Sequence, residues 1–316
     1  MKRALCVLFL LALLSVPAEA TIKWVDFDAS YEAMNRALDL DIQSQGEDNP
    51  QSWIKLLALA AARHGGDMSA SDVADAYRSL MTGASPQELM GENYKYYLYY
   101  WEAYQAVLGG LVGNYAVKIG GVWKTCYGVK AFSPIAAGYW YAHSDDFGTA
   151  RNYGFRRKHL GHDMMGSLGT PVIAVESGTV EALGWNQYGG WRIGIRTDDQ
   201  KRYYYYAHLR KDMPYLDGLR EGDRVEAGQV IGFMGRTGYS TKENTNNIET
   251  VHLHFGIQLI FEEKQKDCNS EIWIDAYQIT RLLERHRSSV IYNETTGTWE
   301  RIYTFVDLDQ EILKND

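Results

Sequence analysis

The sequence predicts an α+β protein, with helices in its first third and a small, mainly antiparallel β domain after them. Apolar residues recur with helical spacing over residues 24–115. From about residue 128, short apolar runs alternate with glycines, as in compact antiparallel sheets. Helical spacing returns at 272–285, and the turn sequence at 295–297 predicts a hairpin within 290–306.

The first twenty residues are typical of a secretory signal peptide. Lys2 and Arg3 give a basic start, residues 4–16 are nearly all apolar, and a small-x-small cleavage site ends at Ala20. The apolar run is shorter than the roughly 20 residues that span a bilayer. We expect no membrane segment beyond this signal, with an uncleaved N-terminal anchor as the alternative. The sequence therefore predicts export, to an extracellular or cell-wall-associated location.

Changes in the sequence pattern divide the remaining chain into three parts. These are a helical domain at 21–127, a β domain at 128–270 and an extension of one helix and one hairpin at 271–316. In the helical part, Pro50 precedes an apolar run that ends at Gly65, which fits proline near the start of a helix and glycine after its end. The strands expected in the β domain are 172–175, 192–195, 202–207, 230–233 and 251–259.

The segment 93–108 predicts a long helix that is rich in tyrosine. Its aromatic residues surround the whole circumference, which is typical of a helix buried on several sides. The alternative is an exposed aromatic face that binds sugars or peptides. These aromatic residues are Tyr94, Tyr96, Tyr97, Tyr99, Tyr100, Trp101 and Tyr104.

Charge limits the classes of partner. The net charge is −8, and it becomes −9 when the two basic residues and one acidic residue of the first twenty are removed. Nucleic-acid-binding proteins present an excess of positive charge to the phosphate backbone. The sequence therefore argues against nucleic acid as a partner. Bulk charge would not attract the chain to anionic polymers either.

Two cysteines, Cys126 and Cys268, follow the signal segment. Outside the cytoplasm they could form a disulfide. Two separate buried thiols fit the sequence equally well. Neither cysteine lies in a CxxC pair, so the sequence does not predict a cysteine zinc site.

Three short histidine motifs carry the chemical information of the β domain. They are HLGHD at 159–163, YAHL at 206–209 and HLHF at 252–255. In an extended strand, residues an even number apart face the same side. This spacing places His159 with Asp163 and His252 with His254, while His162 faces the other way.

A cluster of two imidazoles and one carboxylate suits zinc. Three protein ligands leave a fourth position open for water, as in catalytic zinc sites. Zinc lowers the pKa of such a water towards about 7 and polarises a carbonyl group. The remaining histidines His64, His143 and His286 have no partner motif, and we assign them structural or solvated roles.

The histidine motifs lie within a longer frame of recognisable sequence. It contains GTPVIA at 169–174, GTV at 178–180, GDRV at 222–225, GQVIG at 228–232 and TG at 237–238. In order and wording, residues 147–256 resemble the lysostaphin/LytM family of zinc metalloendopeptidases.

The resemblance implies a small β domain with a long groove and one zinc ion per chain. His159 and Asp163 match the ligands of the family's HxxxD motif, and His254 matches its third ligand. His208 and His252 match its catalytic histidines. The family's activity implies that the partner of this chain is the peptide cross-links of bacterial peptidoglycan.

Two features depart from the family pattern. The family has only a few residues between the TG pair and the HxH motif, whereas this chain has the polar segment 239–251. We expect this insert to form a loop beside the groove. Gly256 stands where the family often has an acidic residue. Tyr153, upstream of the first motif, is either an additional oxyanion donor or a structural tyrosine.

The residues and the resemblance together predict an exported zinc-dependent metalloendopeptidase that hydrolyses peptide bonds in bacterial cell-wall peptidoglycan. One of His208 and His252 would be the base and the other would stabilise the oxyanion. A catalytically silent regulator or scaffold of the cell envelope, acting through the helical region, is the alternative. A peptidase of secreted proteins is a third hypothesis. The intact motifs favour an active enzyme.

Overall fold

The structure is a computed structural model that describes residues 23–25, 27–152, 156–266 and 270–309. The signal segment, Tyr153 and Cys268 lie outside these ranges. Over the described residues the chain forms two compact units. The first runs from Val25 to Gly109, and the second runs from Gly110 onward and includes Lys23 and Trp24.

The first unit consists of helices whose N-termini are capped by serine. The side chains of Ser30, Ser52, Ser69 and Ser85 accept hydrogen bonds from backbone N–H groups of the following first turns. Gly65, with a φ of 67°, ends the second of these helices in a left-handed cap. The elements are α2 (Tyr31–Ser44), α3 (Trp53–His64), α4 (Ala70–Met81), α5 (Pro86–Met90), η1 (Gly91–Asn93) and α6 (Tyr94–Leu108).

Helix α6 is the tyrosine-rich segment, and it packs on α3. Tyr97, Tyr99, Tyr100 and Tyr104 are buried. The rings of Tyr100 and Tyr104 lie with centroids 5.9 Å apart. These four rings therefore belong to the core of the first unit, whereas Trp101 remains exposed.

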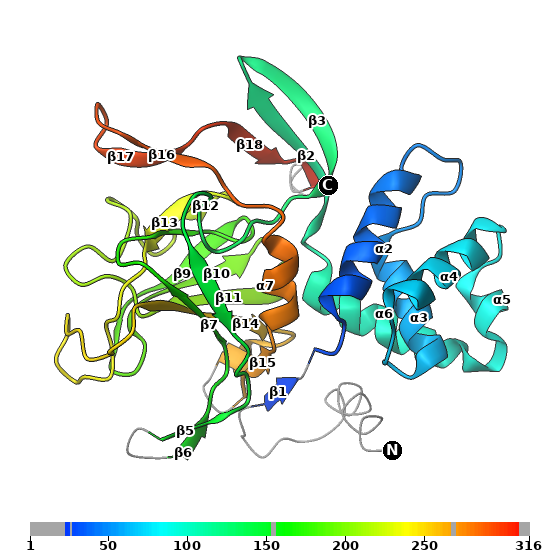
Figure 1. The fold of residues 1–316 in the computed structure, drawn as a ribbon, viewed down its shortest axis with the longest axis horizontal. Coiled ribbons are helices and arrows are strands. Elements are labelled where there is room, and N and C mark those ends of the chain that lie inside the picture. Colours follow the sequence, from blue (N-terminus) through cyan, green and yellow to red (C-terminus); the bar gives the residue numbers. More distant parts are fainter. Residues whose placement is uncertain (1–22, 26, 153–155, 267–269, 310–316) are drawn as a thin grey trace. The chain divides into compact units, whose positions relative to one another are not determined.

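A nine-stranded sheet, counted over the described residues, forms the centre of the second unit (Figure 1). Its main path is β1–β15–β14–β11–β10–β9–β12. β7 pairs with β14 and with β4, and all pairings from β15 to β12 are antiparallel. The strands are β1 (Lys23–Val25), β4 (Tyr141–Ser144), β7 (His162–Gly166), β9 (Gly178–Asn186), β10 (Gly190–Thr197), β11 (Arg202–Ala207), β12 (Arg224–Val225), β14 (His252–Leu259) and β15 (Ile272–Ile274).

Smaller elements complete the second unit. β13 pairs with β8, β16 with β17, β5 with β6, and β2 with both β3 and β18. The β16–β17 pairing is consistent with the hairpin expected within 290–306. The bounds are β2 (Val112–Ile119), β3 (Val122–Val129), β5 (Ala150–Asn152), β6 (Arg156–Lys158), β8 (Pro171–Ile173), β13 (Val230–Phe233), η2 (Glu263–Lys266), α7 (Tyr277–Leu283), β16 (Val290–Asn293), β17 (Thr298–Arg301) and β18 (Thr304–Asp307).

Strand pairing places the unit boundaries differently from the sequence expectation. The hairpin β2–β3 pairs with the C-terminal strand β18, so the units divide at 109/110 and not at 127/128. The helix expected at 272–285 is wrong in its first part. Ile272 and Ile274 alternate into the core as β15, which pairs with β14, and only then does α7 begin. The segment after residue 270 is thus part of the second unit.

Strand alternation gives the main sheet one face for the core and another for a groove. On β10, Ile193 and Ile195 are fully buried while Arg192 lines the groove. On β14, Leu253 is fully buried while His254 lines the groove. The pattern that makes the core therefore also selects the side chains of the groove floor.

A buried charge network lies at the start of β11. Arg202 is 1% exposed, and its Nε donates to Oε1 of Glu176 at 2.8 Å. Its terminal nitrogen also donates to Oδ2 of Asp199 at 2.8 Å, and the hydroxyl of Tyr204 donates to Glu176. Removing one partner of such a pair leaves an uncompensated buried charge.

We predict that Arg202→Met destabilises the second unit by about 3 kcal/mol, because Glu176 would remain buried without its cation. The matched control is Arg224→Met, since Arg224 makes a more exposed pair with Asp198 and should lose less than about 1 kcal/mol. Urea denaturation followed by tryptophan fluorescence measures both. Equal losses in the two variants would show that the Arg202 network adds nothing beyond a surface pair.

Candidate metal centre and groove

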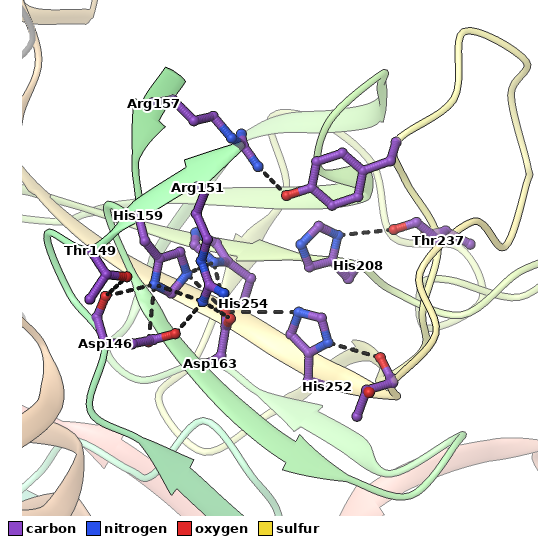
Figure 2. Close-up of polar contacts among 12 residues, drawn as sticks. Asp146, Thr149, Arg151, Arg157, His159, Asp163, His208, Thr237, His252 and His254 are labelled. Carbon is purple, nitrogen blue, oxygen red and sulfur yellow. Dashed lines mark hydrogen bonds and ion pairs between the residues drawn. The ribbon is translucent and has the colours of Figure 1, made fainter. Parts of the chain in front are cut away.

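Three predicted ligands meet where β7 pairs with β14. Asp163 on β7 is the Cα partner of His254 on β14. Nε2 of His159, in the loop before β7, lies 3.0 Å from Oδ1 of Asp163 and 3.0 Å from Nδ1 of His254. Nδ1 of His254 lies 2.9 Å from the same carboxylate oxygen, and Figure 2 shows the three side chains converging.

This donor set fits a tetrahedral zinc site. Zinc bonds of 2.0–2.1 Å to nitrogen and oxygen place neighbouring ligand atoms about 3.3 Å apart. The three donor atoms are 2.9 to 3.0 Å apart, so they need to separate by only about 0.3 Å to hold the ion. Together they form a cluster of metal-binding type among the described residues.

The loop before β7, and not strand alternation, brings His159 to Asp163. β7 begins only at His162, so the extended strand expected over 159–163 is wrong at its start. Gly161 lies in this loop, where an added Cβ would be 2.5 Å from Nε2 of His254. A side chain at this position would therefore push the imidazole out of the site.

Two residues to which the sequence assigned no role orient the cluster. Oδ1 of Asp146 lies 3.0 Å from Nδ1 of His159 and directs the other ring nitrogen towards the site. Arg151 donates to Oδ2 of Asp163 at 3.1 Å and also contacts Asp146 (Figure 2). Asp163 thus keeps one oxygen for the cluster while the arginine binds the other.

His208 and His252 lie beside the cluster with their tautomers fixed by backbone carbonyls. Nδ1–H of His208 donates to the carbonyl of Thr237 at 2.9 Å, and Nδ1–H of His252 donates to the carbonyl of Thr250 at 2.9 Å. In the neutral form of each ring, Nε2 is therefore the nitrogen that can accept a proton. The two ring centroids are 4.8 Å apart, and Nε2 of His252 is 3.8 Å from Asp163.

The other histidines lie away from this cluster. His162 faces the opposite side of β7, where its Nε2 is 2.6 Å from Nδ1 of His143. Nε2 of His143 is 3.0 Å from Glu284. His286 donates to the carbonyl of Ala131 and stacks on a phenylalanine, while His64 lies in the first unit. The expected separation of His162 from the ligands agrees with this geometry.

Burial and hydrogen bonding shift the pKa values of the cluster in opposite directions. Burial opposes the charged form of His159, but hydrogen bonds to Asp146 and Asp163 raise its pKa to about 9. Burial would raise the pKa of Asp163, but contacts with His159 and His254 hold it well below the usual range. Burial lowers the pKa of His254 and of His208, so both are neutral at pH 7.

The cluster lies in a groove of about 1250 Å³ on the sheet. The insert 239–251 forms part of its wall, because Tyr239 and residues 247–250 line it. The insert is anchored by Asn244, whose Oδ1 accepts hydrogen bonds from the indole of Trp191 and from the backbone of Asp212. The loop expected beside the groove therefore lies there.

No helix among the described residues is long and apolar enough to cross a membrane. Cys126, on β3, is half-buried.

The groove holds a His–Asp–His cluster and, beside it, two further histidines whose Nδ1 atoms contact backbone carbonyls. This combination is typical of a hydrolase site. Comparison with known proteins identifies the family. The sequence profile of Peptidase family M23 matches residues 157–268. The chain belongs to this family, whose members are zinc metalloproteases.

Two curated relatives and one solved structure illustrate the similarity. The L-Ala–D-Glu endopeptidase of Bacillus subtilis is 39% identical over 147 residues, 46% of this chain and 41% of the relative. Glycyl-glycine endopeptidase ALE-1 of Staphylococcus capitis is 41% identical over 98 residues, 31% of this chain and 24% of the relative. The chain therefore matches less than half of either relative.

A crystal structure from Ruminococcus gnavus, assigned as a glycyl-glycine endopeptidase LytM, has a TM-score of 0.55 and 26% identity. The match covers 89% of this chain and 97% of that structure. The LytM-like α+β fold that the sequence predicted is thus present.

We predict that alanine substitutions will separate ligands from catalytic groups. His159→Ala, Asp163→Ala or His254→Ala each removes one of three ligands and should strip zinc at micromolar total metal. His208→Ala or His252→Ala should keep about one zinc per chain and lose roughly two to four orders of magnitude in rate. Atomic emission and peptide turnover measure the two effects. Zinc loss from His252→Ala with retention in His254→Ala would reverse the assignment.

We also predict that zinc binding releases a proton below pH 9. His159, with a pKa of about 9 in the metal-free protein, is protonated at pH 8 and must become neutral to bind. Apparent affinity should therefore rise about tenfold per pH unit up to pH 9 and then level off.

Calorimetry at pH 8 in buffers of different ionisation enthalpy counts the released protons. The control is Asp146→Asn, which removes a hydrogen bond that raises the pKa of His159 and should reduce the release. Identical release from wild type and variant would rule out His159 as the source.

Proposed function

We propose that this chain is an exported zinc-dependent endopeptidase that hydrolyses peptide bonds in bacterial cell-wall peptidoglycan. The proposal rests chiefly on one observation. Two histidines whose Nδ1 atoms are held by backbone carbonyls lie beside a His–Asp–His cluster in one groove. A silent regulator could keep the cluster but would not need both of these histidines.

His159, Asp163 and His254 would hold the zinc ion, one per chain. Zinc bound there would supply an activated water and polarise the scissile carbonyl. Their three donor atoms already lie 2.9 to 3.0 Å apart, and Asp146 and Arg151 hold two of these ligands in place. The chain's own contribution is thus a preorganised set of ligands.

His208 and His252 would move the protons. The Nε2 of one accepts the proton of the attacking water, because its Nδ1–H is fixed on a carbonyl. The same nitrogen then donates that proton to the leaving amine. The other histidine, in its protonated form, would donate a hydrogen bond from its Nε2 to the carbonyl oxygen as negative charge develops there. The lowered pKa of the buried His208 keeps it neutral and ready to accept a proton at pH 7.

The substrate class comes from the relatives. Their names specify L-Ala–D-Glu and glycyl-glycine bonds, and another relative, of Vibrio cholerae, is named a peptidoglycan DD-endopeptidase. We propose that the substrate of this chain is likewise the peptide cross-links of peptidoglycan. The signal-like first twenty residues support export to the cell exterior or the wall.

We predict that the purified chain with zinc clears a suspension of isolated peptidoglycan and releases new amino termini. His208→Ala should lower the rate at least about 100-fold, because it removes an acid–base or oxyanion group. The matched control is His64→Ala, a histidine in the first unit that should leave the rate unchanged. Absence of clearing by a wild-type protein that holds one zinc per chain would support the regulator instead. Cleavage of a protein substrate but not of wall material would support the third hypothesis.

A further inference from the structure

The groove continues past the His159–Asp163–His254 cluster and across the open face of β11 and β10. Tyr205 and Tyr203 project from β11 into it, and Trp273 of β15 borders it. The rings of Tyr205 and His254 have centroids 6.0 Å apart, so this floor is continuous with the cluster. Gly194 makes room for Tyr203, because an added Cβ there would lie 1.8 Å from the tyrosine hydroxyl.

Arg192 lies on this floor and has no ion-pair partner within the described ranges. Among the described residues its guanidinium makes no hydrogen bond or ion pair, and its Nε is buried without an acceptor. A buried donor that lacks an acceptor costs free energy, so a group that supplies one from the groove is favoured. Arg192 is therefore a candidate for contact with a bound molecule.

The other described cations of this region are already engaged. Arg196 makes two hydrogen bonds to Glu181, at 2.8 and 3.1 Å. Lys266 lies 2.8 Å from Glu263 and 3.4 Å from Glu181. Arg151 forms ion pairs with Asp146 and with Asp163, one of the three predicted metal ligands. Arg192 differs from these three in having no carboxylate of the described residues within ion-pair distance.

The register gives the distance from Arg192 to the site. Arg192 precedes Ile193, which pairs with Tyr206 on β11, and Ala207 pairs with His254 on β14. Arg192 is thus two strand spacings from His254, about 10 Å between Cα atoms at 4.8 Å per strand. An extended peptide covers this distance in about three residues.

We propose that Arg192 is a specificity-determining residue that binds a free carboxylate of the substrate peptide, within about three residues of the scissile bond. This inference rests on the proposed function and names the class of peptide. A guanidinium presents paired N–H donors that match a carboxylate. The substrate would then be an acidic stem peptide containing a glutamyl residue, rather than an all-glycine bridge.

The neighbours of Arg192 fit a carboxylate subsite. Burial raises the pKa of Tyr203 and of Tyr205, and the positive charge of Arg192 opposes this in both. Their hydroxyls therefore remain protonated donors that can share the anion. Glu271 also faces this charge, but its Oε2 accepts a hydrogen bond from the indole of Trp273 at 2.9 Å. Glu271 and Arg192 form no ion pair, so the guanidinium keeps its donors for a ligand.

A matched pair of peptides tests the proposal. One is L-Ala-γ-D-Glu-L-Lys with a free α-carboxylate, and the other carries a carboxamide at that position. The full-length zinc-loaded protein should cleave the acid with a kcat/KM at least about tenfold above that of the amide. Arg192→Gln should bring the two values within about threefold, through loss on the acid alone. Arg192→Lys should keep part of the preference. Arg224→Gln, outside the groove, should keep all of it.

Calorimetric binding of both peptides to the zinc-free protein gives a second readout. Wild type should bind the acid at least about tenfold more tightly than the amide, and Arg192→Gln should bind them equally. A wild type that does not distinguish the peptides in binding overturns the proposal, as does an Arg192→Gln variant that still prefers the acid. If wall material is not cleared but the binding preference is present, the endopeptidase function fails and the carboxylate subsite stands.

Discussion

The site depends on the register between β7 and β14. This pairing sets Asp163 opposite His254, and a shift by one residue would turn one of the two ligands into the core. The register is fixed from the other face, where Met164 and Leu253 are fully buried. The packing that stabilises the second unit and the geometry that could hold a metal ion are therefore set by the same strand pairing.

The insert 239–251 has a second consequence, because the carbonyls that orient the two catalytic candidates flank or belong to it. His208 is held by the carbonyl of Thr237, just before the insert, and His252 by that of Thr250, near its end. A change in the loop's path would therefore act directly on the acceptor of His252, and the loop begins two residues after the acceptor of His208. The loop that lines the groove is thus also coupled to the proton-transfer groups.

The arginines of the second unit show how an acidic protein distributes its positive charge. Arg202 forms a buried ion pair with Glu176, and Arg196 forms an ion pair with Glu181. Arg192, on the same strand as Arg196, faces the groove and has no such partner in the part of the chain that the structure describes. A net charge of −8 therefore says little about the groove, where the local field depends on the positions of individual charged side chains.

The sequence by itself determined the family and the residues of the cluster, because HLGHD, YAHL and HLHF are short motifs whose order is legible along the chain. It assigned no role to Asp146 or Arg151, and it did not show that Arg192 lacks an ion-pair partner among the described residues. The first two act through contacts with His159 and Asp163 that only folding creates. Whether a charged side chain has a partner likewise depends on all the residues that folding brings near it. Strand β15 and the 109/110 boundary were missed for the same reason. The three-residue strand β15 forms because it pairs with β14, and the β2–β3 hairpin joins the second unit because it pairs with β18. Both partners are remote in sequence, so the local sequence pattern could not predict either pairing.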